Sequence, residues 1–218
     1  MTHVPLGSAG SGGDAAPRSR LRGIYALVDP ARAEPVAFTE ALLRGGIRLF
    51  QVRAKDGIDG YTLVAIVQRV HAQGGIVLVN DDVALARVAD GVHLGQDDLL
   101  RYRLPDVRRA LGTRIVGVSC GTPQEARALD PALVDYVGAG PAFVTGSKHD
   151  AGLPIGVSGV RAVVEATSLP CAAIGGIGID TIGRVRESGA AMAAVISALT
   201  VDDPEGCARR LVAAWGAP

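Results

Sequence analysis

From residue 23 onward, short apolar runs alternate with segments of helical period, and this alternation limits the fold to a few architectures. The runs are rich in Val, Ile, Leu and Ala and mostly lack alternating polar residues, which is typical of parallel strands covered on both faces. We predict eight strands, at residues 23–29, 48–54, 76–81, 91–95, 115–120, 136–141, 171–176 and 193–199.

The segments between these runs predict amphipathic helices. The order Thr122, Pro123 and Glu125 combines a cap, a first-turn proline and an acid three residues after the cap, which indicates a helix start. Asp203 and Pro204 open the last helix in a similar way. In residues 61–73 one broad helical face carries five apolar side chains. They are Leu63, Val64, Ile66, Val67 and Val70.

Eight strands that alternate with about eight helices fit either a (β/α)8 TIM barrel or a doubly wound open sheet. The residues after the first strand, 26–30, read Ala-Leu-Val-Asp-Pro and lack the Gly-x-Gly-x-x-Gly of a dinucleotide-binding sheet. This favours an α/β single-domain barrel over residues 23–218. Residues 1–22 are rich in Gly, Ser, Ala and Pro and lack the apolar segment of a secretory signal, so we predict a flexible tail there.

Charge and cysteine content exclude several classes of function. The 22 basic and 22 acidic residues give a formal net charge of zero, which argues against a nucleic-acid partner. No apolar stretch approaches the length of a membrane span. The three cysteines show no metal-ligand spacing. We therefore expect a cytoplasmic protein with reduced thiols, small-molecule partners and no membrane partner. The sequence does not decide whether the protein is a monomer or a homo-oligomer.

Polar side chains gather where the predicted strands end. In the second run, Gln51, Arg53 and Lys55 share one face and would point into the mouth of a barrel. The alternative is an exposed edge strand with a salt-bridged face. A closed barrel has no edge, so a functional role is the preferred interpretation.

Carboxylates follow the third and fourth strands, at Asp81 and Asp82 and at Asp97 and Asp98. One member of each pair could cap the turn that follows, and the spacing does not decide which. Carboxylates at the ends of neighbouring strands suit Mg²⁺, which takes one or two of them together with waters and phosphate oxygens. His93 lies within an apolar run, where a structural role is the expectation.

Residues after the later strands favour phosphate binding. Thr145, Ser147 and Lys148 combine hydroxyls with a cation after the sixth strand. Glycines 175 and 176 follow the seventh strand, the position at which barrels commonly bind phosphate through backbone N–H groups. Two anion sites beside a metal imply a bridging polyanion, most simply a pyrophosphate. No Ser-His-Asp or Cys-His arrangement is evident, so the predicted chemistry is departure of a stabilised pyrophosphate.

With these motifs in this order, the sequence resembles the thiamine-phosphate synthase family over nearly all of residues 23–204. The motifs are Gln-Val-Arg-Ala-Lys at 51–55, Val-Asn-Asp at 79–81, Asp-Gly-Val-His-Leu-Gly-Gln-Asp-Asp at 90–98, Gly-Val-Ser at 117–119, Tyr-Val-Gly-Ala-Gly-Pro at 136–141, Ala-Ile-Gly-Gly-Ile at 173–177 and Val-Ile-Ser at 195–197. The resemblance implies a TIM barrel that joins 4-amino-2-methyl-5-hydroxymethylpyrimidine diphosphate to a thiazole phosphate, plain or carboxylated, and releases pyrophosphate by a dissociative mechanism.

The resemblance also implies a role for each matching residue. It implies that Asp81 and Asp98 hold Mg²⁺, and that Arg53, Lys55, Ser119 and Lys148 form the catalytic set. It implies a pyrimidine diphosphate site made of Gln51, Arg53, Lys55, Asn80, Ser119 and Lys148. It implies a thiazole phosphate site made of Thr145, Ser147, Gly176, Ile196 and Ser197.

The chain departs from the family pattern at two positions. Asp82 stands where the family usually has Arg, and Ser147 stands where it usually has Thr, although the serine keeps the hydroxyl. Two rival functions are a related thiazole tautomerase and a non-catalytic barrel that binds thiamine-related phosphates. The tautomerase carries a histidine at the position of Gly121 and typically lacks the metal-binding aspartate. Both differences favour the synthase.

Overall fold

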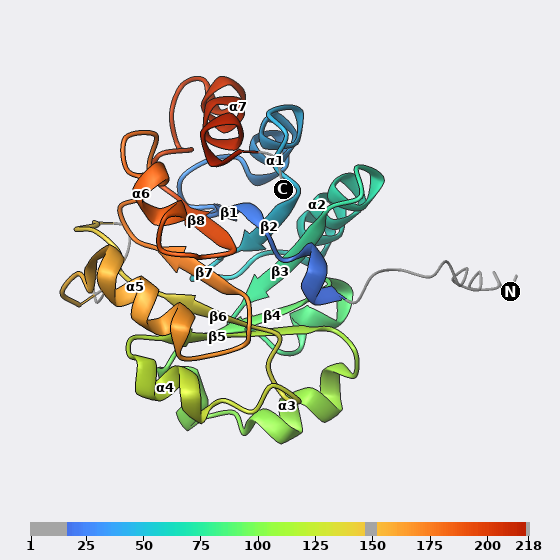
Figure 1. Ribbon diagram of the computed structural model, residues 1–218. Helices are drawn as coiled ribbons and strands as arrows, with labels where there is room; N and C mark the ends of the chain where they lie inside the picture. Colours follow the sequence, from blue (N-terminus) through green and yellow to red (C-terminus); the bar gives the residue numbers. More distant parts are fainter. Residues whose placement is uncertain (1–16, 147–151, 217–218) are drawn as a thin grey trace, which may run out of the picture.

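Each of the eight apolar runs forms a strand, and the strands close in chain order into a parallel barrel (Figure 1). The computed structural model describes residues 17–146 and 152–216. The strands are β1 Gly23–Val28, β2 Leu49–Val52, β3 Ile76–Asn80, β4 Gly91–Leu94, β5 Ile115–Cys120, β6 Tyr136–Ala139, β7 Cys171–Ile174 and β8 Met192–Val195. The predicted barrel is confirmed. Most predicted strands extend one to four residues too far at their carboxyl ends, because the chain leaves the ladder there and enters the loops after the strands.

Helices form the outer layer of the barrel (Figure 1). Over the described ranges the α-helices are α1 Pro35–Arg44, α2 Gly60–Ala72, α3 Leu104–Leu111, α4 Pro123–Ala128, α5 Gly156–Glu165, α6 Ile182–Arg186 and α7 Pro204–Trp215. Only a short 3-10 helix, η2 Leu85–Val88, joins β3 to β4, and a second, η3 Asp97–Leu100, precedes α3. About eight helices were expected; the β3–β4 connection is too short for a full helix.

The predicted helix starts at α4 and α7 are confirmed by their hydrogen bonds. Thr122 Oγ1 accepts from the Glu125 amide at 3.2 Å, and Asp203 Oδ1 accepts from the Gly206 amide at 2.8 Å. The predicted apolar face of α2 is correct except at Val64, whose residue surface is 39% exposed. Val64 lies at the edge of the buried face of α2, so its side chain is partly open to solvent.

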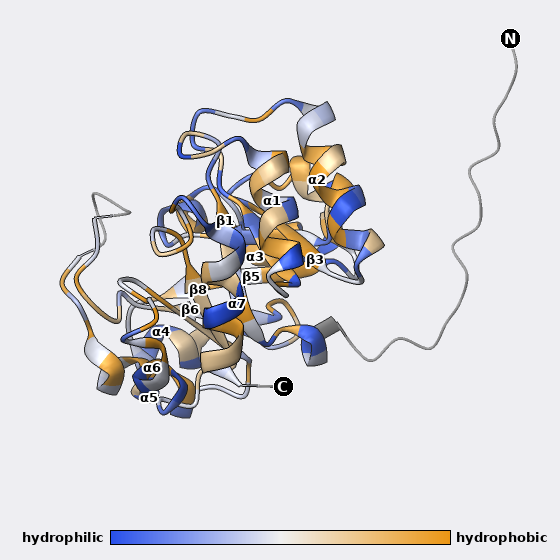
Figure 2. Cartoon of the chain, turned by 90° about the horizontal axis from the view of Figure 1, so that it is seen from above, coloured by the Kyte–Doolittle hydropathy of each residue, from blue (hydrophilic) through white to orange (hydrophobic). Residues whose placement is uncertain are grey.

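Apolar packing is divided into two layers by the barrel wall. Outward-facing strand residues such as Val77 and Val116 pack under the helices in a large buried cluster. Inward-facing residues form a smaller cluster that fills the barrel, including Leu49, Leu78 and Met192. Figure 2 shows the strands in orange, with blue concentrated on the surrounding helices and loops. Because alternate side chains of each strand face inward, the barrel interior is filled, and an open space remains only at its ends.

The amino-terminal segment joins the barrel earlier than predicted. Pro17–Arg20 form a 3-10 helix, Leu21 is 1% exposed inside the barrel cluster, and Arg18 Nε donates to Asp135 Oδ1 at 3.0 Å. Residues 17–22 therefore pack on the barrel instead of belonging to the predicted tail. Leu21 joins the cluster that fills the barrel interior.

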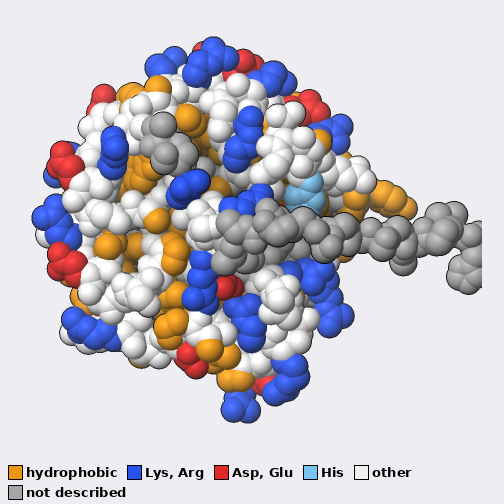
Figure 3. All heavy atoms as spheres, turned by 45° about the vertical axis from the view of Figure 1, so that its right-hand side comes forward, with side chains coloured by type: hydrophobic (Ala, Val, Ile, Leu, Met, Phe, Trp, Pro, Cys, Tyr) orange, Lys and Arg blue, Asp and Glu red, His pale blue; other side chains and the backbone are white. Residues whose placement is uncertain are grey.

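The surface carries both signs of charge. On the face shown in Figure 3, basic and acidic side chains are interspersed among polar and apolar ones. Among the helices of the described ranges, none combines the length and the apolar character that a membrane crossing requires.

Candidate active site

A cavity of about 490 Å³ opens at the carboxyl ends of the barrel strands. This is the end at which barrel enzymes carry their active sites, because the loops after the strands converge there. Two of the predicted site residues, Ser147 and Lys148, lie outside the described residues. All the other predicted site residues line the cavity: Gln51, Arg53, Lys55, Asn80, Asp81, Asp98, Ser119, Thr145, Gly176, Ile196 and Ser197.

The polar face at the end of β2 points into this cavity, as the alternation of the strand requires. Gln51 is 3% and Arg53 9% exposed, whereas Lys55 reaches solvent at the rim. Arg53 Nη1 lies 3.8 Å from Asp29 Oδ2, and the Arg53 amide donates to the Val28 carbonyl at 2.8 Å. Asp29 therefore orients the Arg53 guanidinium from the end of β1. Asp29 was not among the predicted site residues, although a carboxylate directly after an apolar strand was a usable signal.

The acidic pair after β3 divides into a cap and a site residue. Asp82 Oδ1 accepts from the amides of Ala84 at 2.8 Å and Leu85 at 2.9 Å, so Asp82 caps the turn into η2. Asp81 adopts φ 62°, a left-handed conformation that is uncommon outside glycine. Asn80 Nδ2 donates to the Asp81 carboxylate. Asn80 therefore holds the Asp81 carboxylate at the cavity.

Asp98 approaches Asp81 from the end of β4. Asp98 is 9% exposed, and its Oδ2 accepts from the Gly95 amide at 2.8 Å, whereas Asp97 is exposed. Partial burial, followed by a hydrogen bond to Asp98 and the charge of Asp98, raises the pKa of Asp81 to about 6; the positive charge of Arg53 acts in the opposite direction. Two carboxyl groups therefore share one side of the cavity and repel each other when both are ionised.

This pair fits a divalent cation. Like-charged carboxylates held side by side gain most from a cation between them, and oxygen is the ligand that hard cations prefer. Within residues 17–146 and 152–216, no group of three or more His, Cys, Asp or Glu side chains is gathered for metal binding. Two carboxylates match Mg²⁺, which completes its shell with waters and substrate phosphate.

The opposite side of the cavity is made by the loops after β6, β7 and β8. Gly176 adopts φ 63°, and a Cβ there would lie 2.7 Å from the Val144 carbonyl oxygen and 2.8 Å from Phe143 Cβ. Glycine is therefore required for the loop that carries Thr145 to pack against the end of β7. Ser197 follows β8 at the same rim. Small hydroxyl side chains and glycines line this side of the cavity, a composition that suits a phosphate.

A chain of hydrogen-bonded side chains crosses the floor of the cavity. Gln51 Nε2 lies 2.8 Å from Tyr25 Oη, which lies 2.9 Å from Tyr136 Oη. Tyr136 Oη lies 2.8 Å from His93 Nδ1, and His93 Nε2 lies 3.0 Å from Ser119 Oγ. We call Gln51, Tyr25, Tyr136, His93 and Ser119 the floor chain. Burial raises the pKa of both tyrosines, so both phenols stay neutral.

The floor chain was not foreseen from the sequence. His93 was expected to be structural, and it does have buried partners, but it also lines the cavity and contacts Ser119. In the sequence, Tyr25 and Tyr136 stand out only as members of apolar strands. Their position on the inward face of β1 and β6 was a usable signal, since a buried phenol requires a hydrogen-bond partner.

The loop after β5 is fixed by a second set of hydrogen bonds. Gln96 Nε2 donates to the Ser119 carbonyl and, at 2.9 Å, to Glu125 Oε2. The Gly121 amide donates to the same Glu125 oxygen at 2.6 Å. Glu125 was expected to complete a capping box with Thr122, and it reaches the preceding residue instead. These contacts hold Ser119 in place at the cavity.

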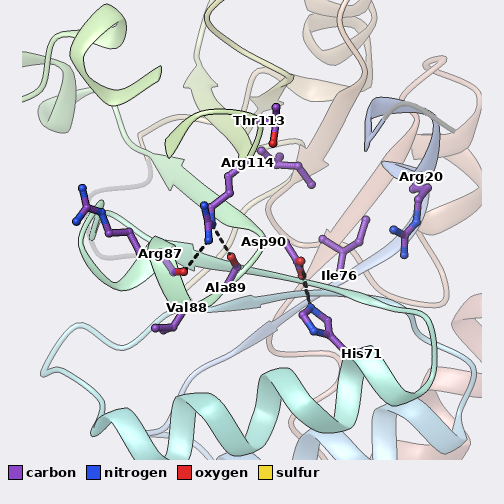
Figure 4. A pocket seen from close by; sticks show the side chains of 10 residues that line it. Arg20, His71, Ile76, Arg87, Val88, Ala89, Asp90, Thr113 and Arg114 are labelled. Atoms are coloured by element: carbon purple, nitrogen blue, oxygen red, sulfur yellow. Dashed lines mark hydrogen bonds and ion pairs between the residues drawn. The ribbon is translucent and has the colours of Figure 1, made fainter. Parts of the chain in front are cut away.

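A second cavity, of about 540 Å³, lies at the amino-terminal ends of β3 and β5. Its charged groups bind the protein itself (Figure 4): Arg114 Nη2 donates to the Arg87 carbonyl at 2.9 Å, and Asp90 accepts from His71 at 2.9 Å. Asp90 also accepts from the Val77 amide at 2.8 Å. In barrels this end serves stability, and these contacts tie the strand starts together.

The fold, with a polar cavity at the carboxyl ends of its strands, defines a class: a (β/α)8-barrel enzyme. Comparison with known proteins identifies the family. The family described as thiamine monophosphate synthase matches residues 24–199, and the chain belongs to that family.

Individual relatives agree with this assignment. The chain is 44% identical over 206 residues to a thiamine-phosphate synthase of Anaeromyxobacter dehalogenans (strain 2CP-C), covering 92% of this chain and 90% of that protein. It is 42% identical over 180 residues to a thiamine-phosphate synthase of Archaeoglobus fulgidus, covering 79% and 83%. Among solved structures, thiamine phosphate pyrophosphorylase from Pyrococcus furiosus superposes with a TM-score of 0.81 at 28% identity, covering 90% and 96%.

Proposed function

We propose that this protein is a transferase that couples 4-amino-2-methyl-5-hydroxymethylpyrimidine diphosphate to a thiazole phosphate, forming thiamine phosphate and releasing pyrophosphate. The observation that carries the proposal is the composition of one cavity: an Asp81–Asp98 pair lines it together with Arg53 and Lys55, and Thr145, Gly175, Gly176 and Ser197 line its other side. The proposal includes Mg²⁺ as cofactor and a cytoplasmic location.

The diphosphate end of the pyrimidine substrate is assigned to the side of the cavity that carries Arg53 and Lys55. The Asp29 carboxylate lies 3.8 Å from Arg53 Nη1 and draws the guanidinium toward the end of β1 before substrate binds. Lys55 stands at the open rim and adds a mobile positive charge. Preorganised cations stabilise the negative charge that grows on a departing pyrophosphate, and a site of this kind needs no covalent nucleophile.

Asp81 and Asp98 would hold Mg²⁺, which when bound would neutralise phosphate charge in the leaving group. The residues themselves support this role. Asn80 and the Gly95 amide hydrogen-bond the two carboxylates and set their positions. Arg53 balances part of their charge and limits the rise in the pKa of Asp81.

The pyrimidine ring is assigned to Gln51 and Ser119, at the two ends of the floor chain. The thiazole phosphate is assigned to Thr145, Gly176, Ile196 and Ser197. In the reaction, the bond between the pyrimidine methylene carbon and the diphosphate oxygen breaks, and the resulting cation is captured by the thiazole nitrogen. The pyrophosphate leaves with the electron pair of the broken bond, so charge and atoms balance.

Two features bear on the departures from the family pattern and on the rival function. The Asp82 carboxylate accepts from the Ala84 and Leu85 amides in the turn before η2, so the substitution of arginine by Asp82 leaves the Asp81–Asp98 pair intact. Gly121, where a tautomerase carries its histidine, has no side chain, and its amide is bound to Glu125. The cavity thus lacks the group on which the tautomerase chemistry depends at that position.

The test is to incubate the purified protein with both substrates and Mg²⁺, and to quantify thiamine phosphate by chromatography and pyrophosphate by a coupled phosphate assay. The proposal expects equal amounts of the two products, formed only when both substrates are present. Conversion of a thiazole carboxyphosphate without pyrophosphate release would instead establish the tautomerase. Substrate binding in calorimetry that is indifferent to Mg²⁺, without turnover, would establish a non-catalytic barrel.

A further inference from the structure

The floor chain spans the barrel interior from β2 through β1, β6 and β4 to β5, and all its links are 2.8 to 3.0 Å long. Two glycines make space for it. A Cβ at Gly117 would lie 2.1 Å from the Tyr136 ring, and a Cβ at Gly138 would lie 3.1 Å from His93 Cε1. The sequence therefore leaves room on β5 and β6 for a polar chain in a place where apolar packing is the ordinary content of a barrel.

The number of protons available along the floor chain determines which group donates at each hydrogen bond. Gln51 Nε2 donates to Tyr25 Oη, so the Tyr25 proton goes to Tyr136 Oη. The Tyr136 proton then goes to His93 Nδ1, which leaves the proton of the neutral imidazole on Nε2, facing Ser119 Oγ. In the reverse direction the Tyr25 proton would have no acceptor among residues 17–146 and 152–216. An unpaired buried hydroxyl is costly, so the first direction is preferred.

We infer that His93 is a positioning residue that is held in its Nε2–H tautomer by Tyr136, and that it thereby turns the Ser119 hydroxyl into a hydrogen-bond donor toward the substrate. Ser119 Oγ accepts from His93, so its own proton is available to the cavity. At the other end, Gln51 Nε2 donates one of its two protons to Tyr25, which fixes the orientation of the amide, and Gln51 Oε1 is the acceptor assigned to the ring.

This polarity selects one chemical class of ring. The floor chain accepts a heterocycle that offers a donor, such as an exocyclic amino group, to Gln51 and an acceptor, such as a bare ring nitrogen, to Ser119. An aminopyrimidine offers both, so the inference rests on the proposed function and sharpens it. A ring that presents a donor instead of an acceptor to Ser119 would face the Ser119 proton with a like group, which lowers affinity.

The first measurement is nitrogen NMR of protein labelled with ¹⁵N-histidine, which distinguishes a protonated from a bare ring nitrogen. Of the four histidines, the His93 signals are those absent from His93→Gln. The inference expects a protonated Nε2 and a bare Nδ1 at neutral pH, and a changed His93 signal in Tyr136→Phe but not in Tyr61→Phe. Tyr61 is 92% exposed on α2 and serves as the matched control. A protonated Nδ1, with Nε2 bare or protonated, would overturn the inference.

The second measurement is steady-state kinetics of Tyr25→Phe and Tyr136→Phe, each of which removes one oxygen from the chain and keeps the ring. The loss of one oriented hydrogen bond is expected to raise the KM for the pyrimidine diphosphate about tenfold, with the KM for the thiazole phosphate within about twofold of wild type. Equal changes in both KM values, or a lower melting temperature alone, would show a merely structural chain and overturn the inference. Absence of any pyrophosphate release in the wild type would refute the proposed function instead, and the NMR result would still decide the polarity.

Discussion

Replacing Asp98 by asparagine tests the carboxylate pair most sharply, because the substitution removes a charge and keeps the shape. The side-chain amide oxygen introduced by Asp98→Asn can still accept from the Gly95 amide, whose donor lies 2.8 Å from Asp98 Oδ2 in the wild type. The fold should therefore persist. Removal of one partner from a buried charged site costs about 3 kcal/mol, which corresponds to a loss of about 10² in the apparent affinity for Mg²⁺.

The loss should depend on pH in a defined direction. A metal requires the carboxylate form of Asp81, and the pKa of Asp81 is raised to about 6, so that form is complete well above pH 6 and is lost as the pH falls through that value. At pH 5.5 about three quarters of Asp81 is protonated, which weakens Mg²⁺ binding in the wild type about fourfold relative to pH 8. In Asp98→Asn the negative charge beside Asp81 is gone, so the pKa of Asp81 moves down and this weakening of Mg²⁺ binding shrinks.

The assay is the Mg²⁺ concentration that gives half-maximal pyrophosphate release, measured at pH 8 and pH 5.5 for wild type, Asp98→Asn and Asp97→Asn. Asp97 is the matched control, because it lines the same cavity but is exposed. We expect Asp97→Asn to stay within about threefold of wild type, since exposed carboxylates contribute little. An equal or larger loss in Asp97→Asn, or a loss in Asp98→Asn that grows as the pH falls, would refute the reasoning.

Three further predictions concern single residues around the cavity. Asp82→Ala removes the acceptor for the Ala84 and Leu85 amides at the start of η2 and should lower the free energy of unfolding by about 1 kcal/mol in urea titrations. The half-maximal Mg²⁺ concentration should not change; a changed Mg²⁺ requirement would make Asp82 a ligand. Gly176→Ala places a Cβ 2.7 Å from the Val144 oxygen and should raise the KM for the thiazole phosphate more than about tenfold while sparing the KM for the pyrimidine diphosphate; the opposite split would exchange the two subsites. Asp29→Asn releases Arg53 and should lower kcat/KM for the pyrimidine diphosphate about tenfold in initial-rate assays, whereas an unchanged value would show that Arg53 needs no support.

The strand pattern could be read from the sequence because every strand of a filled, helix-covered barrel is apolar on both faces. Polar residues such as Gln51 and Arg53 then stand out where a strand ends, and the geometry of a parallel barrel brings all such ends to one side. The spatial grouping of the predicted residues follows from that rule. It did not require knowledge of any side-chain contact.

What the sequence left open was decided by local geometry. The choice between Asp81 and Asp82 depends on which carboxylate reaches the amides of Ala84 and Leu85, and no spacing rule separates them. Tyr25 and Tyr136 looked like ordinary strand residues, because 111 positions separate two hydroxyls that meet at 2.9 Å. Asp29 contacts Arg53 from the neighbouring strand β1, and the pairing of β1 with β2 that brings the two side chains together is not visible in the sequence.

The most direct test is a crystal structure of this protein with Mg²⁺ and pyrophosphate bound. We expect the cation on the carboxylates of Asp81 and Asp98, with pyrophosphate oxygens on the cation and on the side chains of Arg53 and Lys55. Pyrophosphate bound elsewhere, or a cation held without either aspartate, would contradict the proposed chemistry of this cavity.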